Sequence, residues 1–204
     1  MSSYTLGLKK YFKGQLRDAV KLFSSAGKTY FLNGDIERAR EAFYSAGKAI
    51  YELIEDSRWR GYKKKDYVSD YLLAAIYFKL AGVSEKTREI LTKLDEVDLH
   101  RYSLDLRHRA IKLLLQATEQ YNVVDIFEQT DDLIMEWNNL REKEKQKLLG
   151  AYVLLHIVRS ILMNKKSFAR LLWERNEINI MRTYKHMWDE LSLFAQVALG
   201  QRNG

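Results

Sequence analysis

The sequence predicts an all-α protein of about nine helices, and three observations support that fold class. Proline is absent from the 204 residues and glycine supplies only 10, so few positions are barred from a helix interior. Apolar residues recur at intervals of three and four along most of the chain. Residues 14–28 are echoed by residues 34–48, and an internal repeat of this kind is typical of stacked helices.

The N-terminal half is expected to fold into helices joined by short turns. Gly14 ends the first helix and Asn33-Gly34 ends the second, because glycine readily takes the left-handed conformation that closes a helix. Asp35 is placed to cap the third helix, where a carboxylate accepts hydrogen bonds from amides without a helical partner. The apolar period lapses over 57–66, which predicts a loop. The expected helices cover 3–13, 16–32, 36–54, 67–80 and 85–94.

The C-terminal half keeps the helical period but loses the repeat. A sixth helix opens at Asp98 or Ser103 and ends at Tyr121. The last helix carries a wide apolar stripe, which must cover the end of the repeat region or form a homodimer interface. We expect a repeat region over 1–97 and a helical bundle over 98–204 packed on it, as one continuous domain. The remaining expected helices cover 123–140, 142–164, 167–175 and 177–200.

One stretch of about 34 residues resembles a tetratricopeptide repeat (TPR). Small residues let two helices approach there, and aromatic residues fill the space beside them. Phe23 stands where the family has Trp, Ala26 where it has Leu, and Tyr51 where it ends on Pro. The long helices without proline are more similar to the looser vesicle-fusion attachment proteins (SNAP-like). The matching positions are Phe23, Ala26, Gly27, Tyr30, Ala39 and Phe43.

The resemblance implies an antiparallel helix-pair solenoid with a C-terminal cap. Gly27 then lies in a close helix contact, so Gly27→Leu is expected to cost about 1–3 kcal/mol more stability than Gly7→Leu. The helix over 21–32 would line a concave groove that binds another protein or an acidic peptide. The alternative is that its lysines are ordinary solvated charges. The candidate binding residues are Ser24, Lys28, Thr29 and Lys48.

The most basic segment runs from Arg58 to Lys65. Cations interleaved with aromatic rings are typical of nucleic-acid contacts, in which the cations meet phosphates and the rings stack on bases. The formal net charge of +7 also favours an anionic partner, and much of the excess lies in residues 1–97, which hold 18 basic and 13 acidic residues. The alternative is a solvated loop whose aromatic rings turn inward. The candidate residues are Arg58, Trp59, Arg60, Lys63, Lys64 and Lys65.

No catalytic constellation is predicted. The chain has no cysteine, which excludes disulfides and thiol chemistry and suits a reducing compartment. The four histidines show no metal-ligand spacing. One helix carries a cluster of four carboxylates, but a Mg²⁺ site would need further ligands from a second helix. We therefore expect no metal and no cofactor. The carboxylate cluster consists of Glu128, Asp131, Asp132 and Glu136.

A membrane span is not expected, because His156 and Arg159 interrupt the longest apolar run, 148–163. The predicted function is a non-enzymatic cytoplasmic adaptor or scaffold that binds another protein through a TPR-like groove. The alternative is a nucleic-acid-binding accessory protein that uses the basic segment 58–65. A helical hydrolase ranks third.

Overall fold

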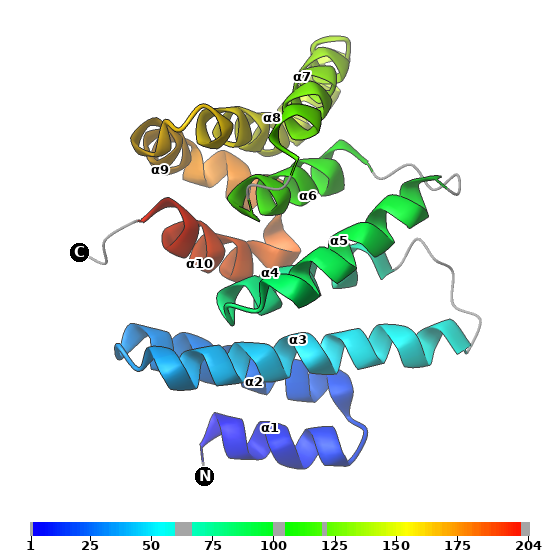
Figure 1. The fold of residues 1–204 in the computed structure, drawn as a ribbon, viewed down its shortest axis with the longest axis vertical. Coiled ribbons are helices and arrows are strands. Elements are labelled where there is room, and N and C mark those ends of the chain that lie inside the picture. The colour runs from blue at the N-terminus through cyan, green and yellow to red at the C-terminus, as the bar shows by residue number, and fades with distance from the viewer. Residues whose placement is uncertain (1, 60–66, 100–104, 120–121, 201–204) are drawn as a thin grey trace. The chain divides into compact units, whose positions relative to one another are not determined.

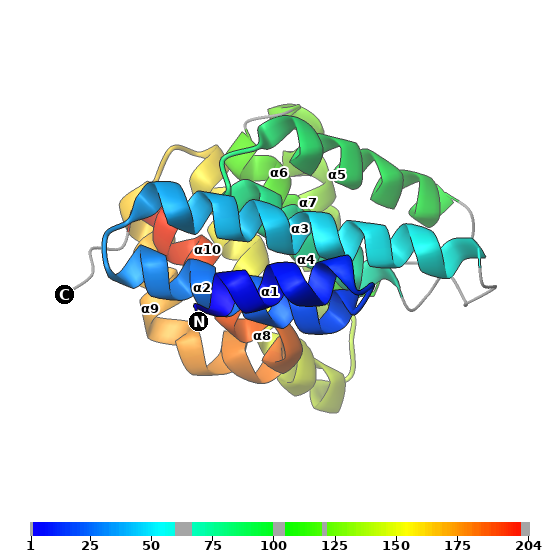
Figure 2. The same ribbon diagram turned by 90° about the horizontal axis from the view of Figure 1, so that it is seen from below.

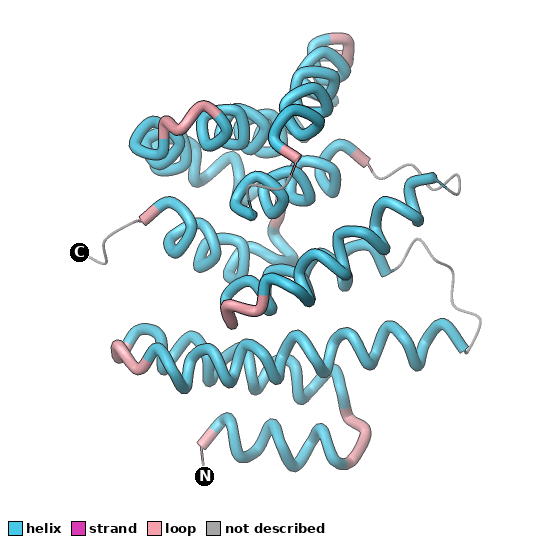
Figure 3. The backbone as a smooth tube through the Cα atoms, in the orientation of Figure 1, coloured by secondary structure: helices cyan, strands magenta, loops and turns pink. Residues whose placement is uncertain are grey.

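The computed structural model describes residues 2–59, 67–99, 105–119 and 122–200. The regular elements in these ranges are helical and none is a strand, which confirms the all-α prediction (Figure 1). Short turns separate most of the helices (Figure 3). The helices are α1 (Ser3–Phe12), α2 (Leu16–Leu32), α3 (Ile36–Trp59), α4 (Val68–Leu80), α5 (Ser84–Leu99), α6 (Leu106–Glu119), α7 (Val123–Asn138), α8 (Glu142–Leu162), α9 (Lys166–Thr183), the short 3₁₀ helix η2 (Lys185–Met187) and α10 (Trp188–Leu199).

The chain divides into two compact units, Met1–Tyr102 and Ser103–Gly204, close to the expected boundary at 97/98. In the N-terminal unit each helix packs on the next one along the chain, from α1 to α5. Helices α1, α2 and α3 lie side by side in both ribbon views (Figure 2). The C-terminal unit is connected differently, since α8 contacts α6, α7 and α9.

Three glycines spaced 20 residues apart explain the repeat of the N-terminal unit. A Cβ atom added at Gly7 would lie 2.8 Å from the ring of Phe23, and one at Gly27 would lie 2.5 Å from the ring of Phe43. A Cβ atom added at Gly47 would lie 3.2 Å from the ring of Phe78. Each glycine thus leaves room for an aromatic ring from a later helix. We therefore expect Gly27→Leu and Gly7→Leu to differ less in their loss of stability than the sequence predicts, because an added side chain meets an aromatic ring at both positions.

Several helix ends differ from the expected ones. Helices α3 and α5 are longer than predicted, ending at Trp59 and Leu99. The break expected at 175–177 is wrong, because α9 runs through it and the Asn176 side chain donates a hydrogen bond to the Leu172 carbonyl one turn earlier. The helix instead ends before Tyr184, whose ring is buried.

This shifted break divides the apolar stripe expected on the last helix between two helices. Ile178 and Met181 lie on α9 and are exposed, whereas Leu191 and Phe194 lie on α10 and are buried. A homodimer interface built on the buried part of the stripe would lack accessible apolar surface. Most of the exposed large apolar side chains of this region lie on α9, and Val197 lies on α10.

Candidate functional site

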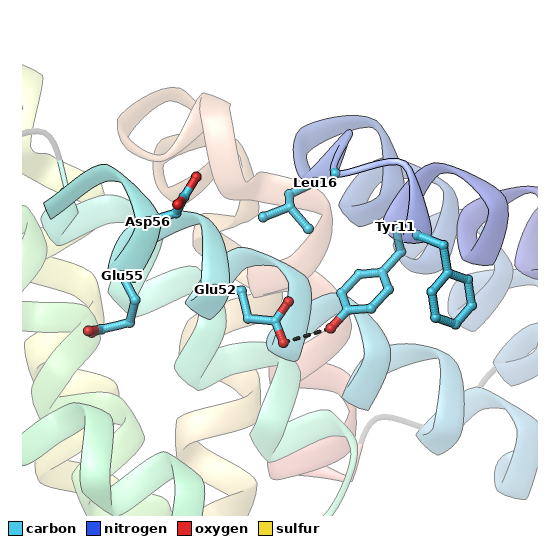
Figure 4. Close-up of a pocket in the computed structure, with 7 residues that line it drawn as sticks. Tyr11, Leu16, Glu52, Glu55 and Asp56 are labelled. Atoms are coloured by element: carbon cyan, nitrogen blue, oxygen red, sulfur yellow. Dashed lines mark hydrogen bonds between the residues drawn. The ribbon is translucent and has the colours of Figure 1, made fainter. Parts of the chain in front are cut away.

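An open groove of about 610 Å³ lies between the α1–α2 turn and the C-terminal part of α3 (Figure 4). Helix α1 ends at Phe12, and Gly14 adopts a left-handed conformation with φ of 70° that turns the chain into α2. Helix α3 is 24 residues long and supplies the opposite wall. The residues lining the groove are Tyr11, Phe12, Gly14, Leu16, Glu52, Glu55 and Asp56.

Phe12 is the apolar feature of this groove. Its side chain is 80% exposed, and it packs edge-on against the ring of Tyr11 with the centroids 5.7 Å apart. Burying a phenylalanine side chain is worth about 1.5–3 kcal/mol relative to leaving it in water. An apolar group docked against Phe12 would recover part of that free energy. Leu16, half-buried at the start of α2, extends the apolar surface.

The opposite wall is acidic. Glu55 and Asp56 lie three and four residues after Glu52, so the three carboxylates share a face of α3. We call these three residues the acidic wall. The Tyr11 hydroxyl donates a hydrogen bond of 2.6 Å to Glu52 Oε1 (Figure 4). This bond ties α1 to α3 and fixes the first carboxylate of the wall.

Two lysines adjoin the acidic wall without reversing its charge. Lys48 Nζ lies 3.9 Å from Glu52 and 5.5 Å from the centroid of the Tyr11 ring. Its interaction with the Tyr11 hydroxyl, followed by the nearby charge of Glu52, raises the pKa of Lys48. Lys93 on α5 lies 3.8 Å from Glu55. Both cations are therefore held by local partners at the edge of the groove.

The structure places the predicted peptide-binding residues on two neighbouring helices, α2 and α3. Ser24 is only 4% exposed, which leaves its hydroxyl too little surface to contact a peptide. The Thr29 hydroxyl donates to the Ser25 carbonyl within α2. Lys28 is half-buried on α2, whereas Lys48 lies on α3 beside the acidic wall. Of the four predicted residues, Lys48 thus adjoins the groove described above.

The predicted anion-binding segment lies outside the described residues. Arg58 and Trp59 end α3, but their side chains are not among those described. Arg60, Lys63, Lys64 and Lys65 belong to the undescribed stretch 60–66. The nucleic-acid hypothesis for this segment remains a prediction from sequence.

Two members of the carboxylate cluster on α7 form ion pairs. Asp131 lies 3.5 Å from Arg159, and Glu136 lies 2.6 Å from Arg109. Among the described residues, no group of three or more histidine, aspartate or glutamate side chains is arranged to hold a metal. No helix in the described ranges is long and apolar enough to cross a bilayer.

No family model, no curated protein and no solved structure matches the chain. The TPR and SNAP-like resemblance therefore remains a prediction from the motif residues. The groove itself was missed at the sequence level, although two signals for it are present. Phe12 stands immediately before a turn, where a large apolar side chain has little to pack on, and the acidic wall has the spacing of one helix face.

Proposed function

We propose that this protein is a non-enzymatic adaptor that binds a segment of another protein in the groove between Phe12 and α3. The observation that carries the proposal is the pairing of an exposed aromatic ring with the acidic wall across an open groove. Aromatic anchors surrounded by polar groups are typical of protein-binding surfaces. The succession of neighbouring helices from α1 to α5 supports the same proposal, because stacked helices present extended binding surfaces.

The charge of the groove favours a cationic segment that also carries an apolar side chain. Lysine or arginine in the segment would reach the carboxylates of Glu52, Glu55 and Asp56, while the apolar side chain packs on Phe12. The chain as a whole is positive, at +7. Exposed charges are screened over about 8 Å at physiological salt, so the carboxylates that line the groove outweigh cations that lie farther away than that.

An acidic peptide, expected from Lys28 and Lys48, suits this groove less well. Lys48 is already engaged by Glu52 and Tyr11, so its charge is partly neutralised in place. An acidic occupant would also face the carboxylates of Glu55 and Asp56. Like charges brought together in this way oppose binding.

Selection from a library of short displayed peptides at physiological salt tests the proposal. We expect enriched peptides to place lysine or arginine next to a large apolar residue. For a synthetic copy of the most enriched peptide, Phe12→Ala should raise the Kd about tenfold, which corresponds to about 1.4 kcal/mol. The double variant Glu55→Lys, Asp56→Lys should weaken binding further and remove its salt dependence.

Matched variants outside the groove serve as controls. Phe168 is another exposed phenylalanine and Glu177 another exposed carboxylate, both on α9. Phe168→Ala and Glu177→Lys should leave the Kd unchanged. Enrichment of no peptide, or binding that Phe12→Ala does not weaken, would overturn the proposed function.

A further inference from the structure

The C-terminal unit carries two exposed helix faces of opposite charge. Helix α8 contacts both α7 and α9, so each of these helices has one side turned to the core of the unit. Their buried residues lie on that side, Ile126 and Leu133 on α7 and Trp173 and Ile180 on α9. Each helix nevertheless keeps large apolar side chains exposed on its other side. Such paired apolar surface on a water-facing helix is typical of an interaction site.

On α9 the exposed row reads Leu171, Arg175, Ile178 and Arg182. These residues follow one another at four-, three- and four-residue intervals, so they share one face of the helix. Ile178 is 60% exposed. The helix holds four basic residues against two acidic ones, for a net charge of +2. We call this row the basic face.

On α7 the exposed row reads Val124, Glu128, Asp132 and Met135. Val124 is 70% exposed and Met135 is 63% exposed, so apolar side chains lie at both ends of the row. The sequence of α7 contains five acidic residues and no lysine or arginine, for a net charge of −5. Together with Asp125 at the first turn, we call this row the acidic face.

We propose that the basic face of α9 packs on the acidic face of α7 from a second copy of this chain. The two faces match in both respects that a helix pair requires, because apolar side chains are present on each and the charges are opposite. In an antiparallel register that sets Arg175 beside Asp132, the rise of about 1.5 Å per residue also sets Arg182 beside Asp125 and leaves Leu171 within one residue of Met135. Both pairs of opposite charge then lie on one side of the contact between Leu171 and Met135.

The contact joins different faces of the two copies. The acidic face of a copy that donates its basic face can meet the basic face of the same partner, which gives a two-fold dimer, or that of a third copy, which gives a chain or a ring. A single helix pair is a small interface, and small interfaces are weak. We expect a Kd of about 10–100 μM and association that weakens as salt rises. The interface does not involve Phe12 or the acidic wall, so it stands apart from the proposed adaptor function.

Sedimentation velocity on the full chain, from about 10 μM to about 1 mM, tests the proposal across the expected range of affinity. The weight-average mass should rise with concentration and fall with added salt. The variant Arg175→Glu, Arg182→Glu makes both faces acidic and should remain monomeric. The variant Asp125→Lys, Asp132→Lys makes both faces basic and should also remain monomeric.

An equimolar mixture of the two reversal variants should associate again, because the reversed α9 of one now meets the reversed α7 of the other. Circular dichroism checks that each variant is folded. The control Lys9→Glu, Lys21→Glu changes the net charge by the same amount at exposed sites on α1 and α2, and should associate like the wild type. A monomeric wild type at every concentration would overturn the proposal. So would unchanged association of the Arg175 and Arg182 variant, or a mixture of folded variants that stays monomeric.

Discussion

The two units bring helices together at glycines, but the glycines meet different groups. In the N-terminal unit a Cβ atom at Gly27 would lie 2.5 Å from the ring of Phe43. In the C-terminal unit a Cβ atom at Gly150 would lie 2.5 Å from the carbonyl oxygen of Asn179 and 2.7 Å from the Cα of Ile180. A ring can tilt or be replaced by a smaller side chain, whereas a backbone moves only with its helix. The first kind of contact can therefore be repaired by mutation, and the second cannot.

Thr183 adds hydrogen bonds to the glycine contact of the C-terminal unit. Its hydroxyl accepts a hydrogen bond of 3.1 Å from the Gly150 amide and donates one of 3.0 Å to the Asn179 carbonyl. The Gly150 amide is buried, so this contact is protected from water. Helices α8 and α9 are thus held by a polar contact as well as by close packing. The N-terminal contacts at Gly7 and Gly27 rest on aromatic packing.

Gly150→Ala tests the less tolerant contact and should have the largest effect. The added methyl group overlaps backbone atoms of α9, so the two helices must separate and the Thr183 hydrogen bond must lengthen. Overpacking costs about 1–3 kcal/mol, and we expect about 3 kcal/mol here even though alanine favours a helix by up to about 1 kcal/mol over glycine. Urea denaturation followed by circular dichroism measures the loss.

Thr183→Ser is the matching control, because it keeps the hydroxyl and removes one methyl group at the same contact. Combined with Gly150→Ala, it should recover little stability, since the carbonyl of Asn179 and the Cα of Ile180 remain in place. A Gly150→Ala protein as stable as the wild type would contradict the description of this contact.

Gly27→Ala should cost less, about 2 kcal/mol, because its methyl group meets the edge of the Phe43 ring rather than backbone. The second change Phe43→Leu removes that edge, so the double variant should be more stable than the sum of the two single changes predicts. A double-mutant cycle measures this coupling, which we expect to be about 1 kcal/mol. Gly47→Ala is the matched control, with its nearest ring atom at 3.2 Å, and it should be nearly neutral. If the stability losses of Gly27→Ala and Phe43→Leu were additive, the Phe43 ring would not be the cause of the loss in Gly27→Ala.

The glycine contacts of the two units also differ in how well they can be predicted from sequence. Gly7, Gly27 and Gly47 recur at a fixed interval, and Gly27 stands in a recognisable pattern of small and aromatic residues. Gly150 is a single glycine inside a long apolar helix. Nothing in its neighbourhood says that a carbonyl from residue 179 approaches it, because that contact depends on how α9 lies against α8.

The candidate site shows a similar limit. Lys48 was predicted from its place in the repeat, but its neighbours Tyr11 and Glu52 come from positions that only the folding of α1 against α3 brings together. Ser24 occupies a regular helix position, and its burial depends on the adjoining helices. Sequence pattern therefore predicts which residues share a helix face. It does not predict which faces remain open once the helices have packed.

Tyr184→Phe tests the second polar contact of the C-terminal unit and should have a smaller effect. Tyr184 is buried at the break between α9 and η2, and its hydroxyl donates a hydrogen bond of 3.0 Å to the Arg107 carbonyl. Removing the hydroxyl should cost about 1 kcal/mol and should be visible as a lower urea midpoint. Tyr11→Phe removes the partly buried hydrogen bond to Glu52 in the N-terminal unit and should cost less, because the Tyr11 side chain is less buried than that of Tyr184. Equal losses of stability in Tyr184→Phe and Tyr11→Phe would contradict the expectation that the polar contact of the C-terminal unit contributes more.

The smallest expected difference between the units is in their response to mild acid. The N-terminal unit has one histidine, His100 near its end, whereas the C-terminal unit holds His156, which is partly buried, and His186, which is exposed. Partial desolvation lowers the pKa of both, the charge of Arg159 lowers that of His156 further, and Asp131 opposes the shift. His108 and Arg107 lower the pKa of His186 further, and Asp105 opposes that shift.

A histidine whose pKa is lowered by folding stabilises the folded state fully above its unfolded pKa of about 6.5, and this contribution is lost as the pH falls toward the folded pKa. The free energy of unfolding should therefore decrease between about pH 7.5 and about pH 5.5. Hydrogen exchange should show faster opening in α8 over this range, with little change in α3 once the intrinsic pH dependence of exchange is removed. His156→Gln with His186→Gln should flatten the response of α8. An equal acceleration in α3 and α8, or a response that survives both changes, would assign the acid sensitivity to other groups.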